Sequence, residues 1–225
     1  MGSAAEKKSF WRTHYDCSTY ERDIGSYAQA VDRSVVEAWL AGKTGLLLDI
    51  PCGTGRFARV ASELTYTVVG ADISLQMLAS NESKMLVQAD AFRMPFRDAS
   101  FDLVLAMRLL FHYPKPEQIL SEIHRTLLPG STTVFDTLNT LSLRHLLQMF
   151  PSLFKPKSAS LWFCSRRRFH KILGHIGFEV IEVKSRYVLP TRSYRFLPLP
   201  LVWLFDKIEF FWPARVVSFW YCKKI

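Results

Sequence analysis

Blocks of apolar and polar positions alternate along the chain in a way that predicts strands followed by helices. The clearest block is the unbroken apolar run Leu46–Leu48, which leads through Asp49 to a turn with Gly53 and Gly55 and then to a helix starting at Arg56. A buried parallel strand, a tight turn and a helix N-terminus produce this pattern. Glycine suits such a turn because its backbone takes angles that a Cβ forbids, while the helix N–H groups face a ligand. We therefore predict a nucleotide-binding turn.

The alternation continues on both sides of this turn. A helix is predicted over Tyr27–Leu40, a second begins at Arg56, and a short third follows a Ser74 cap. Two more are predicted over Pro116–Leu128, where Pro129-Gly130 ends the helix, and over Ser165–His175. Strands are predicted at Thr67–Ala71, Met85–Ala89, Ser100–Ala106, Thr132–Phe135, Gly177–Val183 and Val216–Cys222. Strands that alternate with helices form parallel sheets covered on both faces. The pattern thus predicts a doubly wound α/β fold.

Length and composition favour a single domain over residues 1–225. A chain of 225 residues with 49% hydrophobic residues can bury one full core. The stretch Met1–Lys8 is small and charged, unlike a signal peptide, and no run of about 18 apolar residues occurs, so we expect a cytoplasmic protein. Four scattered cysteines, without a Cys-x-x-Cys or His-Glu-x-x-His pattern, predict neither disulfides nor a metal site.

Charge is distributed unevenly along the chain. Residues 1–140 carry 14 basic and 16 acidic side chains, whereas residues 141–225 carry 15 basic and 4 acidic ones, so the net charge of +9 comes entirely from the last third. That third also holds 17 of the 31 aromatic residues. Basic side chains interleaved with large rings favour an anionic or interfacial partner.

Three aspartates follow predicted strands and are candidates for ligand binding. Asp72 lies roughly 20 residues beyond the glycine turn, where a carboxylate accepts hydrogen bonds from a ribose. Asp90 follows the third strand in the same way. Asp49 ends an otherwise apolar strand, where an unpaired carboxylate costs several kcal/mol, which favours a functional or networked role.

A Gly-x-Gly-x-x-Ala turn alone could also belong to a nicotinamide-dependent dehydrogenase, but the wider pattern is more specific. It comprises Asp49–Gly55, Gly70–Ser74, Gln88–Ala91 followed by Met94-Pro95-Phe96, Phe101–Val104, and Phe111–Pro116 leading to His124–Gly130. These ordered motifs, over about residues 10–137, resemble the class I S-adenosylmethionine-dependent methyltransferases, and most closely the small-molecule branch with the ubiquinone and menaquinone biosynthesis enzymes. The resemblance implies a Rossmann-like, mostly parallel seven-stranded sheet whose last strand is antiparallel. It also implies an N-terminal arm (1–26) over the cofactor and helical or aromatic lid insertions at 139–164 and 187–213.

The resemblance also implies S-adenosylmethionine as cofactor and a set of residues that bind it. These are Asp49, Gly53, Thr54 and Gly55 at the amino acid end, Asp72 at the ribose, Ile73, Asp90 and Ala91 at the adenine, Met107 along the methionine arm, and Tyr15 and Tyr20 closing over it. The first turn glycine of the family is replaced here by Pro51, so that position neither needs a positive φ nor donates a hydrogen bond. His112 and Tyr113 are the candidates for a general base.

Residues outside this shared core must determine which molecule accepts the methyl group. No Asn/Asp-Pro-Pro-Tyr/Phe motif follows Leu105, which argues against amino-group methyltransferases of nucleic acids and proteins. Leu141–Phe154 is expected to be an amphipathic lid helix, and the aromatic and basic segment Leu189–Pro213 either caps the substrate pocket or meets an anionic membrane surface. A small hydrophobic or lipid-like acceptor is therefore the first hypothesis, with peripheral membrane association. An RNA acceptor bound by Arg166–Arg168 is the second, and a non-catalytic cofactor-binding subunit is the third.

Overall fold

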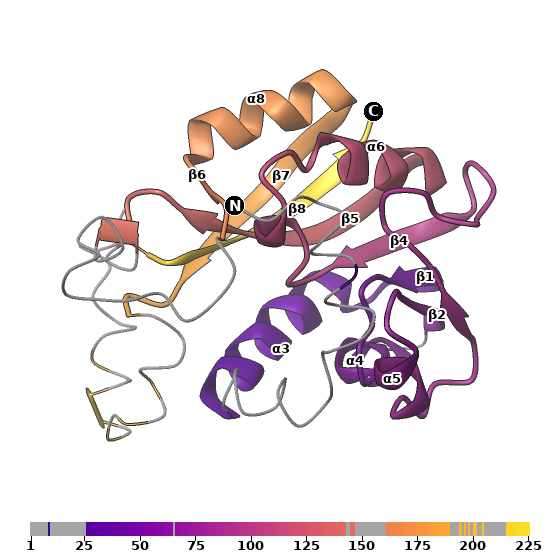
Figure 1. The fold of residues 1–225 in the computed structure, drawn as a ribbon, viewed down its shortest axis with the longest axis horizontal. Helices are drawn as coiled ribbons and strands as arrows, with labels where there is room; N and C mark the ends of the chain where they lie inside the picture. The colour runs from indigo at the N-terminus through magenta and orange to yellow at the C-terminus, as the bar shows by residue number, and fades with distance from the viewer. Residues whose placement is uncertain are drawn as a thin grey trace.

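The computed structural model describes residues 9, 26–64, 66–142, 145–146, 161–189, 194, 196, 198, 200–201, 204 and 215–225. Within these residues, eight strands form one sheet in the order β3-β2-β1-β4-β5-β8-β7, with the short β6 paired to β5 (Figure 1). The sheet order reverses between β1 and β4, so the carboxyl ends of these two strands define the topological switch point at which ligands bind in doubly wound folds.

The first five strands of the chain are parallel to one another. They are β1 (Gly45–Asp49), β2 (Tyr66–Asp72), β3 (Leu86–Gln88), β4 (Phe101–Ala106) and β5 (Leu127–Asn139). β8 (Val217–Lys224) is antiparallel to both β5 and β7 (Phe178–Arg186), which makes β7 parallel to β5. The carboxyl ends of β1, β4, β5 and β7 consequently share one edge of the sheet. The predicted mostly parallel sheet with an antiparallel last strand is confirmed.

Helices cover both faces of the sheet, as Figure 1 shows, with α3, α4 and α5 on one side and α6 and α8 on the other. Alternate strand residues face the two layers: Leu47 packs with α3 (Ser26–Leu40) and α4 (Arg56–Glu63), whereas Leu48 packs with α6 (Glu117–Thr126) and α8 (Arg166–Ile176). α5 (Leu75–Ala79) lies against β2 and β3. Two buried cores result, as expected for a sheet that is apolar on both faces.

Side-chain caps fix the starts of two helices where the sequence predicted them. Ser74 accepts a hydrogen bond from the Met77 N–H at the start of α5, and Ser165 accepts one from the Arg168 N–H at the start of α8. An N-cap of this kind satisfies one of the otherwise unpaired N–H groups of the first turn.

The structure differs from the predicted elements at two places, and a further predicted helix lies mostly outside the described residues. The strand β6 (Phe163–Cys164) was not predicted and adds an eighth strand, because two residues carry no detectable period. The helix before β5 ends at Thr126 rather than at Leu128, and Pro129-Gly130 falls within the span of β5, where the ladder with β4 is interrupted between Leu127 and Thr132. Most of the predicted helix Leu141–Phe154 lies outside the described residues.

Candidate functional site

The turn between β1 and α4 is shaped by two glycines in left-handed backbone conformations. Gly53 has a φ of 51° and Gly55 a φ of 85°, and a Cβ at Gly55 would come within 2.5 Å of Asn81 Oδ1. Asn81 also donates from Nδ2 to the carbonyl oxygen of Gly53 at 2.9 Å. The turn thus needs glycine for both its angles and its space. Thr54 lies half-buried between them, and the peptide bond from Ile50 to Pro51 is cis.

Asp49, at the carboxyl end of β1, is fully buried behind this turn. Among the described residues, neither of its carboxylate oxygens has a hydrogen-bond partner. Burial raises the pKa of Asp49 to about 8, and Asp72 raises it further; Arg56 lowers it by a smaller amount, and so does the backbone of Ala58, which is close but does not reach hydrogen-bond geometry. A buried carboxyl without partners is costly unless a ligand supplies them. The amino group of a bound S-adenosylmethionine is a cationic donor that fits this need.

Asp72, at the end of β2, ties the turn to the next strand. Its Oδ2 accepts the Gly53 N–H and its Oδ1 accepts the Ser74 N–H, both at 2.9 Å, and the residue is only 6% exposed. Burial raises the pKa of Asp72, and these backbone N–H groups oppose that rise. Because each carboxylate oxygen has two lone pairs, the oxygens retain acceptor capacity for ribose hydroxyls.

The predicted adenine residues follow β2 and β3. Ile73 is half-buried, and its carbonyl oxygen accepts a hydrogen bond from Gln88 Nε2 at 3.1 Å. Asp90 Oδ1 accepts the Phe92 N–H at 2.9 Å, which shapes the turn that contains the half-buried Ala91. The structure therefore brings the tips of β1, β2 and β3 together as the motif order implied.

Met107 and Arg108 directly follow β4 and lie beside a buried charge network that the sequence analysis missed. Met107 is buried, and Arg108 has a left-handed φ of 62°, unusual for a residue with a side chain. The Arg108 N–H donates to Asp136 Oδ1 at 2.6 Å, and its guanidinium binds Asp32 Oδ2 through Nη2 at 2.5 Å. Tyr187 donates its hydroxyl to Asp32 Oδ1 at 2.7 Å. These contacts join α3, β4, β5 and the end of β7.

Arg56 connects this network to the cofactor turn. Its guanidinium lies 3.4 Å from Asp32 Oδ2, and its charge acts on Asp49. Burial raises the pKa of Asp136 to about 6, a rise that Arg108 opposes. No local sequence pattern marks these residues, since they are isolated polar positions: Asp32 lies in α3, Arg108 in the turn after β4 and Asp136 in β5. The only available signal was a charged residue within an apolar helix or strand.

The two candidate bases lie in different surroundings. His112 closes the short 3-10 helix η1 (Leu110–His112), is half-buried, and has its ring 4.6 Å from that of Phe111. Tyr113 is buried against the edge of Phe92, and burial, with smaller effects of Asp90 and Asp72, raises its pKa to about 12. Burial therefore disfavours the phenolate form of Tyr113. Tyr15 and Tyr20 lie outside the described residues.

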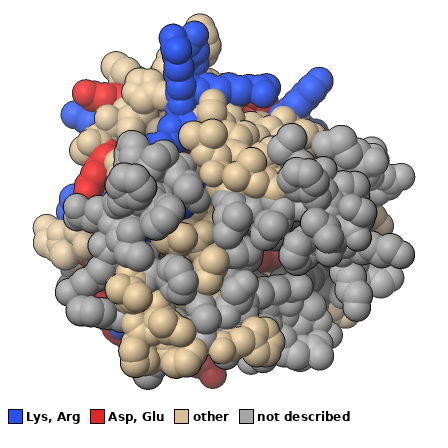
Figure 2. Space-filling view, turned by 90° about the vertical axis from the view of Figure 1, so that its left-hand side faces the viewer, with Lys and Arg blue, Asp and Glu red and all other residues tan. Residues whose placement is uncertain are grey.

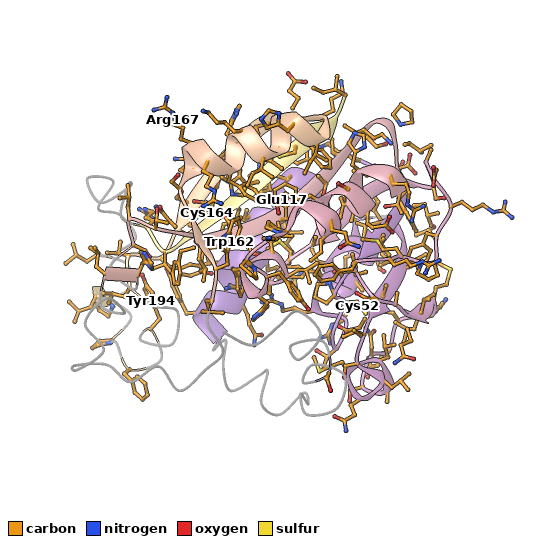
Figure 3. The ribbon with its side chains drawn as sticks, turned by 45° about the horizontal axis from the view of Figure 1, so that its top comes forward. Cys52, Glu117, Trp162, Cys164, Arg167 and Tyr194 are labelled. Atoms are coloured by element: carbon orange, nitrogen blue, oxygen red, sulfur yellow. The ribbon has the colours of Figure 1, made fainter. Side chains whose placement is uncertain are left out.

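Beyond the ends of β1 to β4, the same edge of the sheet has an aromatic half next to the end of β7. The Tyr194 ring stacks on Tyr27 at 5.0 Å and meets Tyr187 edge-on at 5.8 Å, and Phe163 of β6 packs against the same core. In Figure 3 the labels Cys52, in the glycine turn, and Tyr194 stand toward opposite ends of the molecule, with Trp162 and Cys164 between them. The edge thus has a polar, glycine-rich half and an aromatic half.

The described residues show no cluster of three or more His, Cys, Asp or Glu side chains able to hold a metal ion. Over the same part of the chain, no helix has the length and apolarity needed to cross a bilayer. The described cysteines Cys52, Cys164 and Cys222 are all buried free thiols, and burial raises the pKa of Cys164 to about 11. These thiols are therefore not activated nucleophiles.

Sequence comparisons agree with this geometry. The family described as "Methyltransferase domain" matches residues 48–135. The demethylmenaquinone methyltransferase of Staphylococcus aureus is 30% identical over 167 residues, which span 61% of this chain and 69% of that enzyme. A sterol 24-C-methyltransferase of Gibberella zeae is 33% identical over 123 residues, or 47% of this chain, but these residues span only 32% of the sterol enzyme.

Solved structures share the fold at lower identity. A methyltransferase dependent on S-adenosylmethionine from Thermotoga maritima has a TM-score of 0.69 at 21% identity, covering 97% of this chain and 98% of that one. The magnesium protoporphyrin IX methyltransferase of Synechocystis, solved with bound S-adenosylhomocysteine, has a TM-score of 0.66 at 17% identity, covering 97% of this chain and 99% of that one.

Proposed function

The chain belongs to the class I S-adenosylmethionine-dependent methyltransferases of the small-molecule type, and from this premise we propose that it methylates a hydrophobic or lipid-linked small molecule. The observation that carries the proposal is the division of the strand-end edge into a cofactor half and an aromatic half. The cofactor half contains the glycine turn with Asp49 and Asp72, and the aromatic half contains Tyr27, Tyr187 and Tyr194. Aromatic rings beside the strand ends favour an acceptor with an apolar body.

We assign the cofactor contacts to the residues at the tips of β1 to β4. Asp49 and the turn Gly53, Thr54 and Gly55 would bind the amino acid end, Asp72 the ribose, Ile73, Asp90 and Ala91 the adenine, and Met107 the methionine arm, with Tyr15 and Tyr20 closing over them. The unpartnered carboxyl of Asp49 and the glycine requirement at position 55 support this assignment.

The residues near the acceptor mainly have to orient it and exclude water. S-adenosylmethionine supplies a methyl group already activated on a sulfonium sulfur, so alignment of the acceptor accounts for much of the catalysis. A base is needed only for an acceptor that is protonated at neutral pH, such as a phenol. His112 and Tyr113 are the candidates for such a base. The hydrogen bond from the Trp162 N–H to the Phe111 carbonyl oxygen, at 2.7 Å, holds the short helix η1 that carries His112.

Exposed apolar and basic side chains at one end of the molecule support a lipid-like acceptor taken from an anionic membrane surface. Five large apolar side chains are exposed there: Leu141, Leu146, Phe196 (84% exposed), Leu201 and Leu204. Arg167, Arg168 and Lys171 of α8 are exposed as well. Figure 2 shows lysine and arginine side chains projecting from one border of this face. Apolar rings that enter a bilayer beside cations that meet its phosphates are typical of interfacial binding.

The sterol and menaquinone enzymes do not act on RNA by name, and the basic charge of the last third is the observation that favours an RNA acceptor. The quinone and sterol names of those two enzymes are consistent with an apolar acceptor.

The proposal is tested by calorimetric titration of the full chain with S-adenosylhomocysteine, followed by transfer of labelled methyl groups. Asp72→Ala should abolish micromolar binding, whereas Asp98→Ala, which removes an exposed carboxylate paired with Arg125, should not. Methyl transfer is then assayed on a prenylated hydroquinone, a sterol and total RNA. Labelling of RNA alone would overturn the lipid-like acceptor, and unchanged binding by Asp72→Ala would overturn the cofactor site.

A further inference from the structure

Two turns at the carboxyl edge of the sheet contain a residue in a backbone conformation that favours glycine. Arg108, the second residue after β4, has a φ of 62°, and Tyr187, the first residue after β7, has a φ of 65°. In the part of the chain that the structure describes, Ala99 is the one other residue with a side chain and a positive φ. Because the Cβ of an L-residue crowds the following carbonyl oxygen in this conformation, other contacts must hold it.

Asp32 of α3 contacts both of these residues. Its Oδ2 accepts hydrogen bonds from Arg108 Nη2 at 2.5 Å and from Arg108 Nε at 3.2 Å, and its Oδ1 accepts one from the Tyr187 hydroxyl at 2.7 Å. Asp32 is fully buried, and the Arg108 side chain is only 14% exposed. Hydrogen bonds to charged groups are stronger than neutral ones, and burial strengthens them further, so these contacts can offset the backbone strain.

Asp136 of β5 holds Arg108 at a second point. β5 runs beside β4 with Phe135 opposite Ala106, so Asp136 stands next to the first residue beyond β4. Asp136 Oδ1 accepts the Arg108 backbone N–H at 2.6 Å, and its Oδ2 lies 3.6 Å from Arg108 Nε. Burial lowers the pKa of Arg108, but the charges of Asp32 and Asp136 raise it above its ordinary value. The guanidinium therefore stays charged in this buried place.

The backbone angle of Arg108 sets how two parts of the proposed site lie relative to each other. Met107, which precedes it, is buried and is assigned above to the methionine arm of the cofactor. The helix η1, which carries His112, starts two residues after Arg108, and its first residue, Leu110, is fully buried. A rotation about the N–Cα bond of Arg108 therefore displaces one of two packed segments, either Met107 or η1.

We propose that Arg108 is a positioning residue of the methyltransferase site. Its left-handed conformation, held by Asp32 and Asp136, places Met107 against the methionine arm of S-adenosylmethionine. Arg108 acts through Met107 rather than by contact with the cofactor. The proposal rests on the cofactor contacts proposed above and deepens them, and through Tyr187 the same carboxylate of Asp32 also holds the turn after β7 in the aromatic half.

The test compares two variants that lose the same guanidinium. Arg108→Gly adopts the left-handed conformation without strain, whereas Arg108→Ala retains the strain and has lost the contacts that offset it. A smaller fraction of Arg108→Ala molecules then has the binding conformation, and the apparent affinity falls by that fraction. Calorimetric titration of the full chain with S-adenosylhomocysteine should give an affinity for Arg108→Gly within fivefold of the unaltered chain, and an affinity for Arg108→Ala at least fivefold weaker than for Arg108→Gly.

Ala99→Gly is the control for a glycine introduced at a positive φ. Ala99 is exposed in the turn that precedes β4, at the opposite edge of the sheet, and has a φ of 48°. This variant should bind S-adenosylhomocysteine as tightly as the unaltered chain. Urea denaturation of every variant shows whether affinity follows stability. A purely structural role of Arg108 would lower the stability of both variants and leave their affinities equal.

A second pair keeps the comparison possible if the loss of Arg108 prevents folding. Asp32→Asn removes one of the two buried acids that would lack their arginine, and the glycine and alanine variants are compared again in that background. Equal affinity of the two variants, or tighter binding by the alanine variant, would overturn the proposal in either background. Absence of binding by the unaltered chain is a distinct result, which would overturn the cofactor assignment and this proposal with it.

Discussion

At the scale of single residues, Asp49 is costly for folding, although the same buried carboxyl is proposed to bind the cofactor. Its carboxyl group is fully buried, has no hydrogen-bond partner among the described residues, and titrates at a pKa raised to about 8 by that burial. A cationic group next to it would favour its ionised form and lower that pKa. Ligand binding and proton release should therefore be coupled at this residue.

The first prediction concerns the pH dependence of cofactor binding. Asp49 is mostly protonated in the free protein below pH 8, and a bound ammonium group favours the carboxylate, so affinity for S-adenosylhomocysteine should rise between pH 6 and pH 8. The slope is at most about tenfold per pH unit for one proton. Calorimetry in two buffers of different ionisation enthalpy measures the released proton. Asp49→Asn should bind weakly and lose the slope; an unchanged slope would assign the proton to another group.

The second prediction concerns stability. Because the folded pKa of Asp49 lies above its ordinary value of 3.8, ionisation in the unfolded chain draws the protein toward unfolding as the pH rises from about 4 to 8. Asp49→Asn removes this effect and should raise the free energy of unfolding by on the order of 1–3 kcal/mol at pH 7. Urea denaturation at pH 4.5 and pH 7.5 should show the larger gain at the higher pH. A loss of stability at pH 7.5 would contradict the pKa assignment.

The sequence predicted the positions of the candidate residues at strand ends, but not the residues that contact and support them. Asp49 and Asp72 stand at strand ends beside a glycine turn, and that local pattern is sufficient to find them. Asn81 could not be found in this way, because its contact with Gly53 joins positions 28 residues apart. Asp32 and Asp136 were missed for the same reason: their partner Arg108 comes from a third element.

At the scale of elements, the same limit appears in the strands and helices. The long helix α3, Ser26–Leu40, was predicted to within one residue, and the start of α4 at Arg56 was predicted as well, since an apolar stripe at helical spacing is visible in the sequence. β6 has only two residues, and its existence depends on pairing with Leu138 and Asn139 of β5. Elements that are defined by a distant partner rather than by their own period cannot be predicted from the local pattern.

The third prediction tests how α3 is held to the sheet. The Tyr187 hydroxyl donates to Asp32 Oδ1 at 2.7 Å and lies 3.0 Å from the Ala28 carbonyl oxygen, and both Tyr187 and Asp32 are fully buried. Tyr187→Phe leaves buried acceptors without a donor and should lower the free energy of unfolding by about 1–3 kcal/mol. Chemical denaturation measures the change.

Tyr66→Phe is the matched control for this variant. Tyr66 is also a buried tyrosine of the same core, but its hydroxyl has no hydrogen bond with the described residues. Its removal should change stability by less than about 1 kcal/mol. Equal losses in the two variants would show that the hydrogen bond to Asp32 contributes nothing specific.

At the scale of the whole molecule, charge and catalysis occupy different ends of the chain. The family match covers residues 48–135, whereas the basic excess lies entirely in residues 141–225. The basic side chains outside the shared core can therefore interact with the methyl acceptor or with the surface from which it comes. The basic side chains exposed on α8 are the part of this excess on which the proposed contact with a membrane can be tested.

The fourth prediction follows from this placement. The full chain should sediment with liposomes containing phosphatidylglycerol and not with pure phosphatidylcholine, and binding should fall steeply between 0.05 and 0.5 M salt, as screening of surface charge requires. The triple variant Arg167→Gln, Arg168→Gln and Lys171→Gln removes three exposed cations of α8. It should weaken binding by about two powers of ten, at roughly 1 kcal/mol for each cation near the surface.

A control variant with the same net charge shows whether liposome binding depends on the position of the cations or on the total charge of the chain. Arg59, Lys84 and Arg97 are exposed cations outside the basic third, and their replacement by glutamine lowers the net charge by the same three units. If the membrane meets the α8 end, this control should retain most of its binding, because potentials fall off within a Debye length. Equal weakening in both variants would mean that the chain is attracted as a diffuse cation. The exposed apolar side chains would then have to be explained without a bilayer.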